Sequence, residues 1–257
     1  MIQNVYIEGD IVEGGGQLME RPDVPIFAKP IFDPLFFVLI GTSVLCGLLI
    51  YVREIQEVDY FQYRFLLWNL FLAWLPLLVS MSALLLARIA KGRDLAVCLA
   101  LLGTAWLLLY PNAPYLTTDF IHLVSNPNYF AHQDKGLSFW YDLVLFFLFS
   151  WCGLLLGYLS MRHFHSIVSY YVNAWFGWIF VLVVAFLGGF GVYLGRVIRL
   201  NSWDVLFNPF RLIGGIVEGI NRNAAIFTIL FGTLILIVYV TLFLLGSHHL
   251  KRSAVMK

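Results

Sequence analysis

Long uninterrupted apolar runs dominate the chain, and short polar segments separate them. Six of these runs carry no charged residue and approach or exceed the length of about 20 residues that a helix needs to cross a bilayer. We place them at residues 35–52, 65–87, 95–110, 143–161, 167–195 and 223–247. The apolar positions are continuous and do not alternate with polar ones, which favours helices over the strands of a membrane barrel. The pattern therefore predicts an all-α fold, a polytopic transmembrane helical bundle of about six membrane helices.

The remaining segments complete the predicted domain organisation. Residues 1–33 form an acidic N-terminal arm with several prolines and a Gly-Gly-Gly turn, residues 34–250 form a single transmembrane domain, and residues 251–257 form a basic tail. Residues 205–221 mix apolar positions with arginine, glutamate and asparagine, which predicts a short helix in the headgroup region. Two helices separate the loop after the third run from the loop after the fifth. Both loops therefore lie on the same face of the membrane.

Composition supports the membrane assignment and narrows the partners. The chain is 61% hydrophobic and 12% charged, against about half and about a quarter in soluble domains. Sixteen basic and fifteen acidic residues nearly cancel, so no strong field attracts nucleic acid. Nine of the sixteen lysines and arginines fall on the face that holds both termini, which by the positive-inside rule places both termini in the cytoplasm. We expect a bacterial inner or plasma membrane, or an internal membrane.

The third run ends in a segment rich in turn formers, residues 110–122 (YPNAPYLTTDFIH). Pro111 and Pro114 predict that the helix unwinds here, because proline lacks the N–H group that a regular helix uses. Thr117 or Thr118 is expected to cap a new helical turn. This segment places turn formers, an acid and a histidine where the third run leaves the lipid.

Acids, arginines and a histidine gather on the same face as this segment. Asp119 and His122 are three residues apart and share one side of the new turn. We single out Asp119, His122 and Asp142 as candidate catalytic or metal-binding groups, and Asn112, Arg196, Arg199, Asn201 and Asp204 as candidate anion- or headgroup-binding groups. The sequence therefore predicts one composite polar site, built from the segments 111–142 and 195–209.

Three interpretations of this site stay open. The first is structural, since partly buried charges need partners and a closed ion-pair network would tie the helix ends together. The second is catalytic: Asp119, His122 and Asp142, with Asp204 as a further ligand, would hold a divalent metal. In a variant of it, His122 would act as a general base while the two arginines hold a phosphate. The third is binding of a lipid headgroup, a small anion or a partner's loop without chemistry.

Other polar or small residues in the runs are interpreted as structural. Asn69 is costly in lipid and is expected to hydrogen bond to a neighbouring helix. The small-residue pairs Gly153–Gly157 and Gly191–Gly195 predict close helix contacts. Four histidines beside basic residues at helix ends are interpreted as interfacial charge and not as ligands: His163, His165, His248 and His249.

Several motifs of the polar segments resemble those of an uncharacterised family of bacterial and plant-plastid membrane proteins, a domain of unknown function. The resemblance covers roughly residues 65–220. It rests on Pro111-Asn-Ala-Pro-Tyr115, Thr118-Asp119 with His122, Trp140-Tyr-Asp142, Gly191-x-Tyr193-Leu-Gly195-Arg196, Arg199-x-Asn201-Ser-Trp-Asp204 and Asn208-Pro209. It implies a polytopic helical membrane protein, and it implies no particular activity.

The functional expectation is an integral membrane protein of unknown activity with a polar interfacial site. The leading hypothesis is binding of a lipid headgroup or another anion, with metal- or His-assisted hydrolysis or transfer, and whether the protein is an enzyme stays open. The alternative is a non-catalytic subunit or assembly factor that contacts other membrane subunits through residues 1–33, and a third is a small-solute transporter. Membrane lipid is the expected partner, with no nucleic acid. The cofactor is open between none and a divalent metal; no nucleotide is expected, because the glycines at 188–191 follow no strand.

Overall fold

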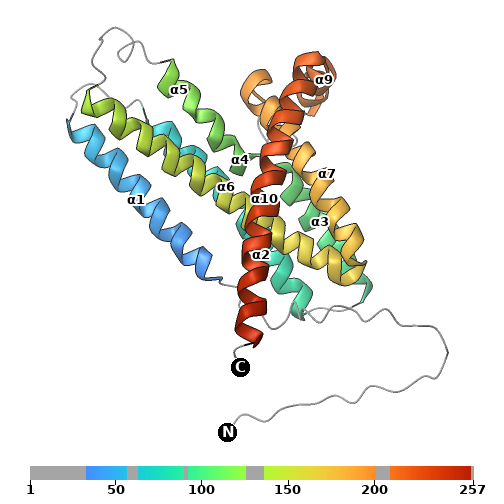
Figure 1. Cartoon of the computed structure of the whole chain (residues 1–257). Helices are drawn as coiled ribbons and strands as arrows, with labels where there is room; N and C mark the ends of the chain where they lie inside the picture. Colours follow the sequence, from blue (N-terminus) through green and yellow to red (C-terminus); the bar gives the residue numbers. More distant parts are fainter. Residues whose placement is uncertain (1–32, 57–62, 90–91, 126–135, 201–208, 256–257) are drawn as a thin grey trace, which may run out of the picture.

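The computed structural model describes residues 33–56, 63–89, 92–125, 136–200 and 209–255. Within these ranges every regular element is helical, and six helices are long and apolar enough to cross a membrane. The helices run side by side as a bundle (Figure 1). The predicted all-α bundle with six membrane helices is confirmed. The expectations for the arm at residues 1–32 lie outside the described residues.

The elements follow one another along the chain as helices joined by short connections. They are α1 (Pro34–Gln56), α2 (Arg64–Ile89), α3 (Arg93–Leu109), α4 (Asn112–Tyr115), η1 (Leu116–Asp119), α5 (Phe120–Val124), α6 (Leu137–Tyr171), α7 (Ala174–Tyr193), η3 (Leu194–Ile198), α9 (Pro209–Gly219) and α10 (Arg222–Val255). The short helix that the sequence predicts between the fifth and sixth membrane helices is confirmed as α9, and its place in the headgroup region stays a prediction.

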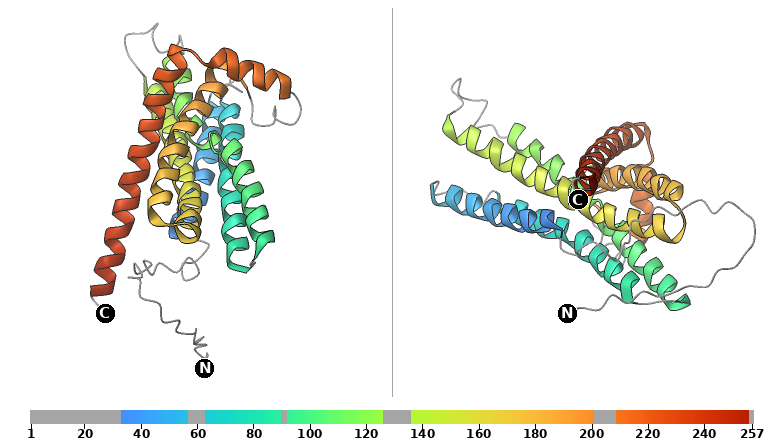
Figure 2. Two further views of the ribbon diagram at one scale, coloured as in Figure 1. Left: turned by 90° about the vertical axis from the view of Figure 1, so that its right-hand side faces the viewer. Right: turned by 60° about the horizontal axis from the view of Figure 1, so that its bottom comes forward.

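Helix α6 lies at the centre of the bundle and organises the packing. It contacts α1, α2, α7 and the α4–η1 segment, whereas α10 packs mainly on α7 and α3 mainly on α2. Figure 2 shows the result, with α10 on one outer side of the bundle and α3 on the other. The buried side chains form two clusters along the length of α6, one around Leu66, Leu145 and Phe149 in its first part and one around Trp106 and Tyr239 in its second part.

The predicted position of the break between the fourth and fifth membrane helices, residues 162–166, is wrong. Helix α6 continues to Tyr171, and Asn173 then caps α7 by accepting a hydrogen bond of 2.9 Å from the Phe176 backbone. His163 and His165 were interpreted as interfacial charge, yet both are buried inside α6.

Buried partners explain why the helix continues through these polar residues. His163 Nδ1 lies 3.0 Å from Ser80 Oγ, and His165 Nδ1 lies 2.6 Å from the Tyr239 hydroxyl. A polar side chain that finds such a partner no longer needs water. His248 and His249 belong to α10, and their side chains lie outside the described residues.

The expected unwinding of the third helix amounts to a short break: α3 ends at Leu109, and a turn at Tyr110 and Pro111 leads into α4. The backbone keeps right-handed helical angles through Pro111 and Pro114, tightens to a 3₁₀ turn in η1 and reaches Val124 as one span of 32 residues. The Ala113 N–H donates to the Tyr110 carbonyl at 3.1 Å, which bridges the position where proline has no donor. The Tyr110 carbonyl, which the missing N–H of Pro114 would leave without a donor in a regular α-helix, is satisfied by this bond, which has the i→i−3 spacing of a 3₁₀ turn.

The expected threonine cap is wrong for a related reason. Thr117 Oγ1 donates to the Pro114 carbonyl at 2.7 Å, and Thr118 Oγ1 donates to the Tyr115 carbonyl at 2.6 Å. The two hydroxyls therefore satisfy carbonyl groups of the preceding turn and not the N–H groups of a new helix. The short turns follow one another with right-handed helical angles, and no side chain caps the start of α4, η1 or α5.

Candidate functional site

Helix α6 approaches the α4–η1 segment at its glycines. A Cβ atom placed on Gly153 would overlap the Ala113 carbonyl oxygen and lie 3.0 Å from Leu116 Cβ. A Cβ on Gly157, one turn along, would lie 3.5 Å from Ala113 Cβ. The predicted close contact of this glycine pair is confirmed. The segment that the two glycines contact is α4–η1, the part of the third membrane helix that ends at Asp119.

Helix α7 and the π turn η3 that continues it approach the other side of the same segment through their own glycines. A Cβ atom on Gly191 would overlap the Pro111 ring, and one on Gly195 would lie 3.3 Å from the Tyr115 ring. The motif is thus wedged between two glycine-lined helices. The close packing on both sides fixes the backbone position from which Thr118 and Asp119 extend.

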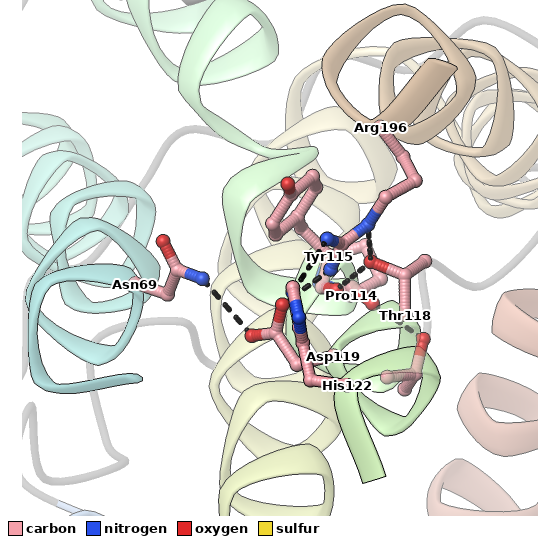
Figure 3. A network of polar contacts seen from close by, with 8 residues as sticks. Asn69, Pro114, Tyr115, Thr118, Asp119, His122 and Arg196 are labelled. Atoms are coloured by element: carbon pink, nitrogen blue, oxygen red, sulfur yellow. Dashed lines mark hydrogen bonds and ion pairs between the residues drawn. The ribbon is translucent and has the colours of Figure 1, made fainter. Parts of the chain in front are cut away.

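Arg196 joins the fifth membrane helix to the third. It lies in η3, a π-helical turn, and turns of this kind are frequent at functional sites. Its Nε donates to Thr118 Oγ1 at 2.7 Å, and its Nη2 forms an ion pair with Asp119 Oδ1 (Figure 3). The guanidinium carbon lies 4.4 Å from the centre of the Tyr115 ring, a cation–π contact. A single arginine therefore holds three neighbouring residues of the motif.

Asp119 is the buried centre of this network. Only 1% of the residue is exposed. Its Oδ2 accepts a hydrogen bond of 3.0 Å from Asn69 Nδ2 of α2, so the helix–helix hydrogen bond expected for Asn69 is confirmed. Both carboxylate oxygens are thereby engaged, one by a cation and one by an amide. A buried carboxylate arranged in this way is compensated for the loss of water.

His122 stands at the exposed edge of the network. Its ring lies 4.6 Å from the Phe65 ring, and its Nε2 lies 3.3 Å from Arg196 Nη1. A guanidinium group only donates, so Nε2 acts as the acceptor and the ring hydrogen is placed on Nδ1. His122 therefore offers a neutral ring with one N–H donor at the protein surface.

Asp142 belongs to a second, separate network. It is fully buried and accepts from Arg53 Nε at 2.8 Å and from the Tyr63 hydroxyl at 2.9 Å. The apolar ring of Phe146 lies 5.3 Å from the Tyr63 ring and 6.3 Å from the ring of Phe120, the residue after Asp119. The structure thus brings Asp119 and His122 together, and it places Asp142 elsewhere.

The metal hypothesis requires these acids and the histidine to converge. Across the described part of the chain, no group of three or more histidine, cysteine, aspartate or glutamate side chains gathers as a metal site would require. Asp204, the further ligand considered, lies outside the described residues.

The other candidate residues differ in exposure. Asn112 is partly buried in the first turn of α4, and Arg199 is exposed directly after η3 with a backbone φ of 62°. Asn201 lies outside the described residues. Sequence reasoning did not single out Arg53 and Tyr63 as partners of Asp142. Nothing in their spacing could have shown it, because the contact depends on which helices are neighbours.

Comparison with known proteins identifies a family. A family model described as "Protein of unknown function (DUF1361)" matches residues 68–238. No curated protein and no solved structure matches the chain. The matched range contains every member of the Asp119 network described above except Phe65, whereas Arg53 and Tyr63 precede it.

Proposed function

The chain belongs to the DUF1361 family, whose function is unknown, and from that premise we propose that it binds the anionic headgroup of a membrane lipid. The proposed site is the end of the bundle where His122, Arg196 and Arg199 lie. The single observation that carries the proposal is the exposed guanidinium group of Arg199 beside a network whose own charges are already paired.

The pairing of the acids favours binding over hydrolysis or transfer. Asp119 is engaged by Arg196 and Asn69, and Asp142 by Arg53. A carboxylate that is buried and bonded at both oxygens is poorly placed to take a proton from a substrate, since a general base must reach that proton at hydrogen-bond distance. The acids therefore act here as supports for the cations.

Arg199 supplies a positive charge in addition to the paired charges of Asp119 and Arg196. It follows the π turn in the left-handed backbone region, which a non-glycine residue adopts at a cost of about 1–2 kcal/mol. The Arg199 N–H donates to the Leu194 carbonyl, which fixes the turn. Within the described ranges its side chain has no hydrogen bond or ion pair, whereas the charge of Arg196 is offset by Asp119. An arginine fork of this kind suits phosphate oxygens.

The length of the third membrane helix supports headgroup depth. Asp119 follows Arg93, the first residue of that span, by 26 residues. At a rise of 1.5 Å per residue this is about 39 Å of helix, longer than the hydrocarbon thickness of about 30 Å. If Arg93 lies at one surface, Asp119 and His122 reach the headgroups of the other. Lipid phosphate is the anion that this face meets at high concentration.

The test is ligand-dependent stability of the purified protein in a neutral detergent. Soluble short-chain phosphatidylglycerol should raise the thermal unfolding midpoint of the wild type, and phosphatidylcholine should raise it less. Ligand at one hundred times its Kd stabilises by about 2.7 kcal/mol. The Arg199→Gln variant should lose most of this rise, and the His122→Gln variant part of it.

The matched control is Arg222→Gln, which removes an exposed arginine from the start of α10. It should respond as the wild type does. Glycerol phosphate, added in place of the lipid, separates a free anion from a headgroup. An equal rise in the wild type and in Arg199→Gln would overturn the proposal.

A further inference from the structure

We propose a second lipid site at the opposite end of the bundle, in a cavity that holds an acyl chain of an anionic phospholipid next to Arg88. The cavity has a volume of about 500 Å³ and lies between the end of α2, the start of α3 and the end of α6. Figure 1 shows these helix ends at the end of the bundle away from α9. Its size falls in the range of about 300–1,000 Å³ typical of ligand pockets. This site is independent of the headgroup site proposed above.

Small residues and the course of α3 create the space. Gly92 precedes α3 with a φ of 88°, a left-handed conformation that glycine adopts without strain. Helix α3 then packs mainly on α2. A space is therefore left between the first turns of α3 and the end of α6. Ala87, Gly92 and Ala96 line the cavity and carry almost no side chain that could occupy it.

The walls of the cavity are apolar and its rim is polar. Leu95 and Ile167 are buried in the wall, and Leu99 continues it. Tyr170 and Tyr171 lie at the rim with about half of each residue exposed, and their rings meet edge to face at 5.0 Å. Tyrosines in this position are typical of the boundary between hydrocarbon and headgroups. The cavity therefore fits an amphipathic molecule with its chain inside and its polar group at the rim.

The charge at this rim selects an acidic headgroup. Arg88 lines the cavity from the last turn of α2, and Arg93 is exposed at the start of α3 beside Asp94. Arg162, also on α6, is already paired with Asp33 at 3.2 Å. Among the described residues at this rim, Arg88 and Arg93 outnumber Asp94, and each lysine or arginine at a membrane surface adds about 1 kcal/mol of attraction to anionic lipid. The occupant we assign is therefore an anionic phospholipid.

Lipid retention tests both halves of this assignment. The protein is reconstituted in vesicles of equal amounts of phosphatidylglycerol and phosphatidylcholine, released in detergent, and its bound lipid is counted by native mass spectrometry. Ala96→Trp should fill the cavity and remove the retained lipid. Leu101→Trp, at an exposed position of the same helix, should retain it. Arg88→Gln should lower the preference for phosphatidylglycerol about fivefold, which corresponds to about 1 kcal/mol.

Equal retention by Ala96→Trp and the wild type would overturn the site, and an unchanged preference in Arg88→Gln would overturn the headgroup assignment. A second measurement covers variants that do not fold. Phosphatidylglycerol with a photoreactive acyl chain should label the wild type within residues 95–99 and 167–172. Labelling confined to other helices contradicts the proposal, as does equal labelling by the phosphatidylcholine analogue.

Discussion

The ion pair of Asp119 and Arg196 shows how one residue can decide the geometry of the polar face. Asp119 is almost completely buried, and Arg196 is mostly covered. Removing one partner of such a pair leaves a desolvated charge behind, which is costlier than the net worth of the pair. The carboxylate also positions the arginine against Thr118 and Tyr115. Its loss would therefore affect both stability and the shape of the site.

Asp119→Asn is expected to lower the free energy of unfolding by about 3 kcal/mol, because Arg196 would lose its counter-charge in a covered position. Equilibrium unfolding in detergent measures this change. The matched control is Glu54→Gln, which removes the acid of the more exposed ion pair with Arg64. Solvent-exposed ion pairs contribute little to stability, so this variant should lose much less. Similar losses for the two variants would contradict the structural role assigned to Asp119.

At this scale the sequence predicted part of the site. Asp119 and His122 are three residues apart in a helical segment, and helix counting placed Arg196 on their face, so the meeting of these three residues could be anticipated. The separation of Asp142 could not. It depends on the lateral order of helices that brings Arg53 and Tyr63 to α6, and residue spacing along one helix carries no information about that order.

At the scale of elements, two glycine-lined helices hold the prolines of the third membrane helix. Gly153→Ala and Gly191→Ala should each lower the free energy of unfolding by about 1–3 kcal/mol, because the added methyl group would overlap Ala113 or the Pro111 ring. Thermal unfolding in detergent measures the loss.

Gly47→Ala provides the control with the opposite expected sign. Nothing lies within 4 Å of a Cβ at this helical position, so the helix-forming advantage of alanine, about 1 kcal/mol at most, should stabilise the protein or leave it unchanged. If Gly191→Ala proved as stable as Gly47→Ala, the close approach of α7 to Pro111 would be refuted.

The elements also show why apolar runs predict membrane helices better than they predict helix ends. All six helices were anticipated, since lipid-facing surface demands apolar residues over the whole span. The ends were misplaced where polar residues find partners inside the protein. His163 and His165 stay helical because Ser80 and Tyr239 satisfy them, and the break at Pro111 stays short because the Ala113 N–H bonds to the Tyr110 carbonyl across it.

At the scale of the whole molecule, six membrane helices place both termini on one side. We predict that this side is the cytoplasm, from the excess of lysine and arginine there. The measurement uses a variant without its three natural cysteines and with a single new one at Asn4→Cys or Ser253→Cys. A membrane-impermeant maleimide should label neither position in intact cells and both after permeabilisation.

Each alternative result has its own meaning in this experiment. Labelling of both positions in intact cells would reverse the orientation. Labelling of one position alone would contradict an even number of crossings. The reagent applied to the cysteine-free variant gives the background.

The distance along the chain between Asp119 and Arg196 has a consequence for synthesis. The two residues are 77 positions apart, whereas Asn69, the other partner of Asp119, precedes it. At about 5–20 residues per second, Arg196 leaves the ribosome roughly 4–15 s after Asp119. During that interval the carboxylate has its amide partner and not its cation. The polar end of the bundle that carries Asp119 is therefore completed late, when the fifth membrane helix brings Arg196 to the third.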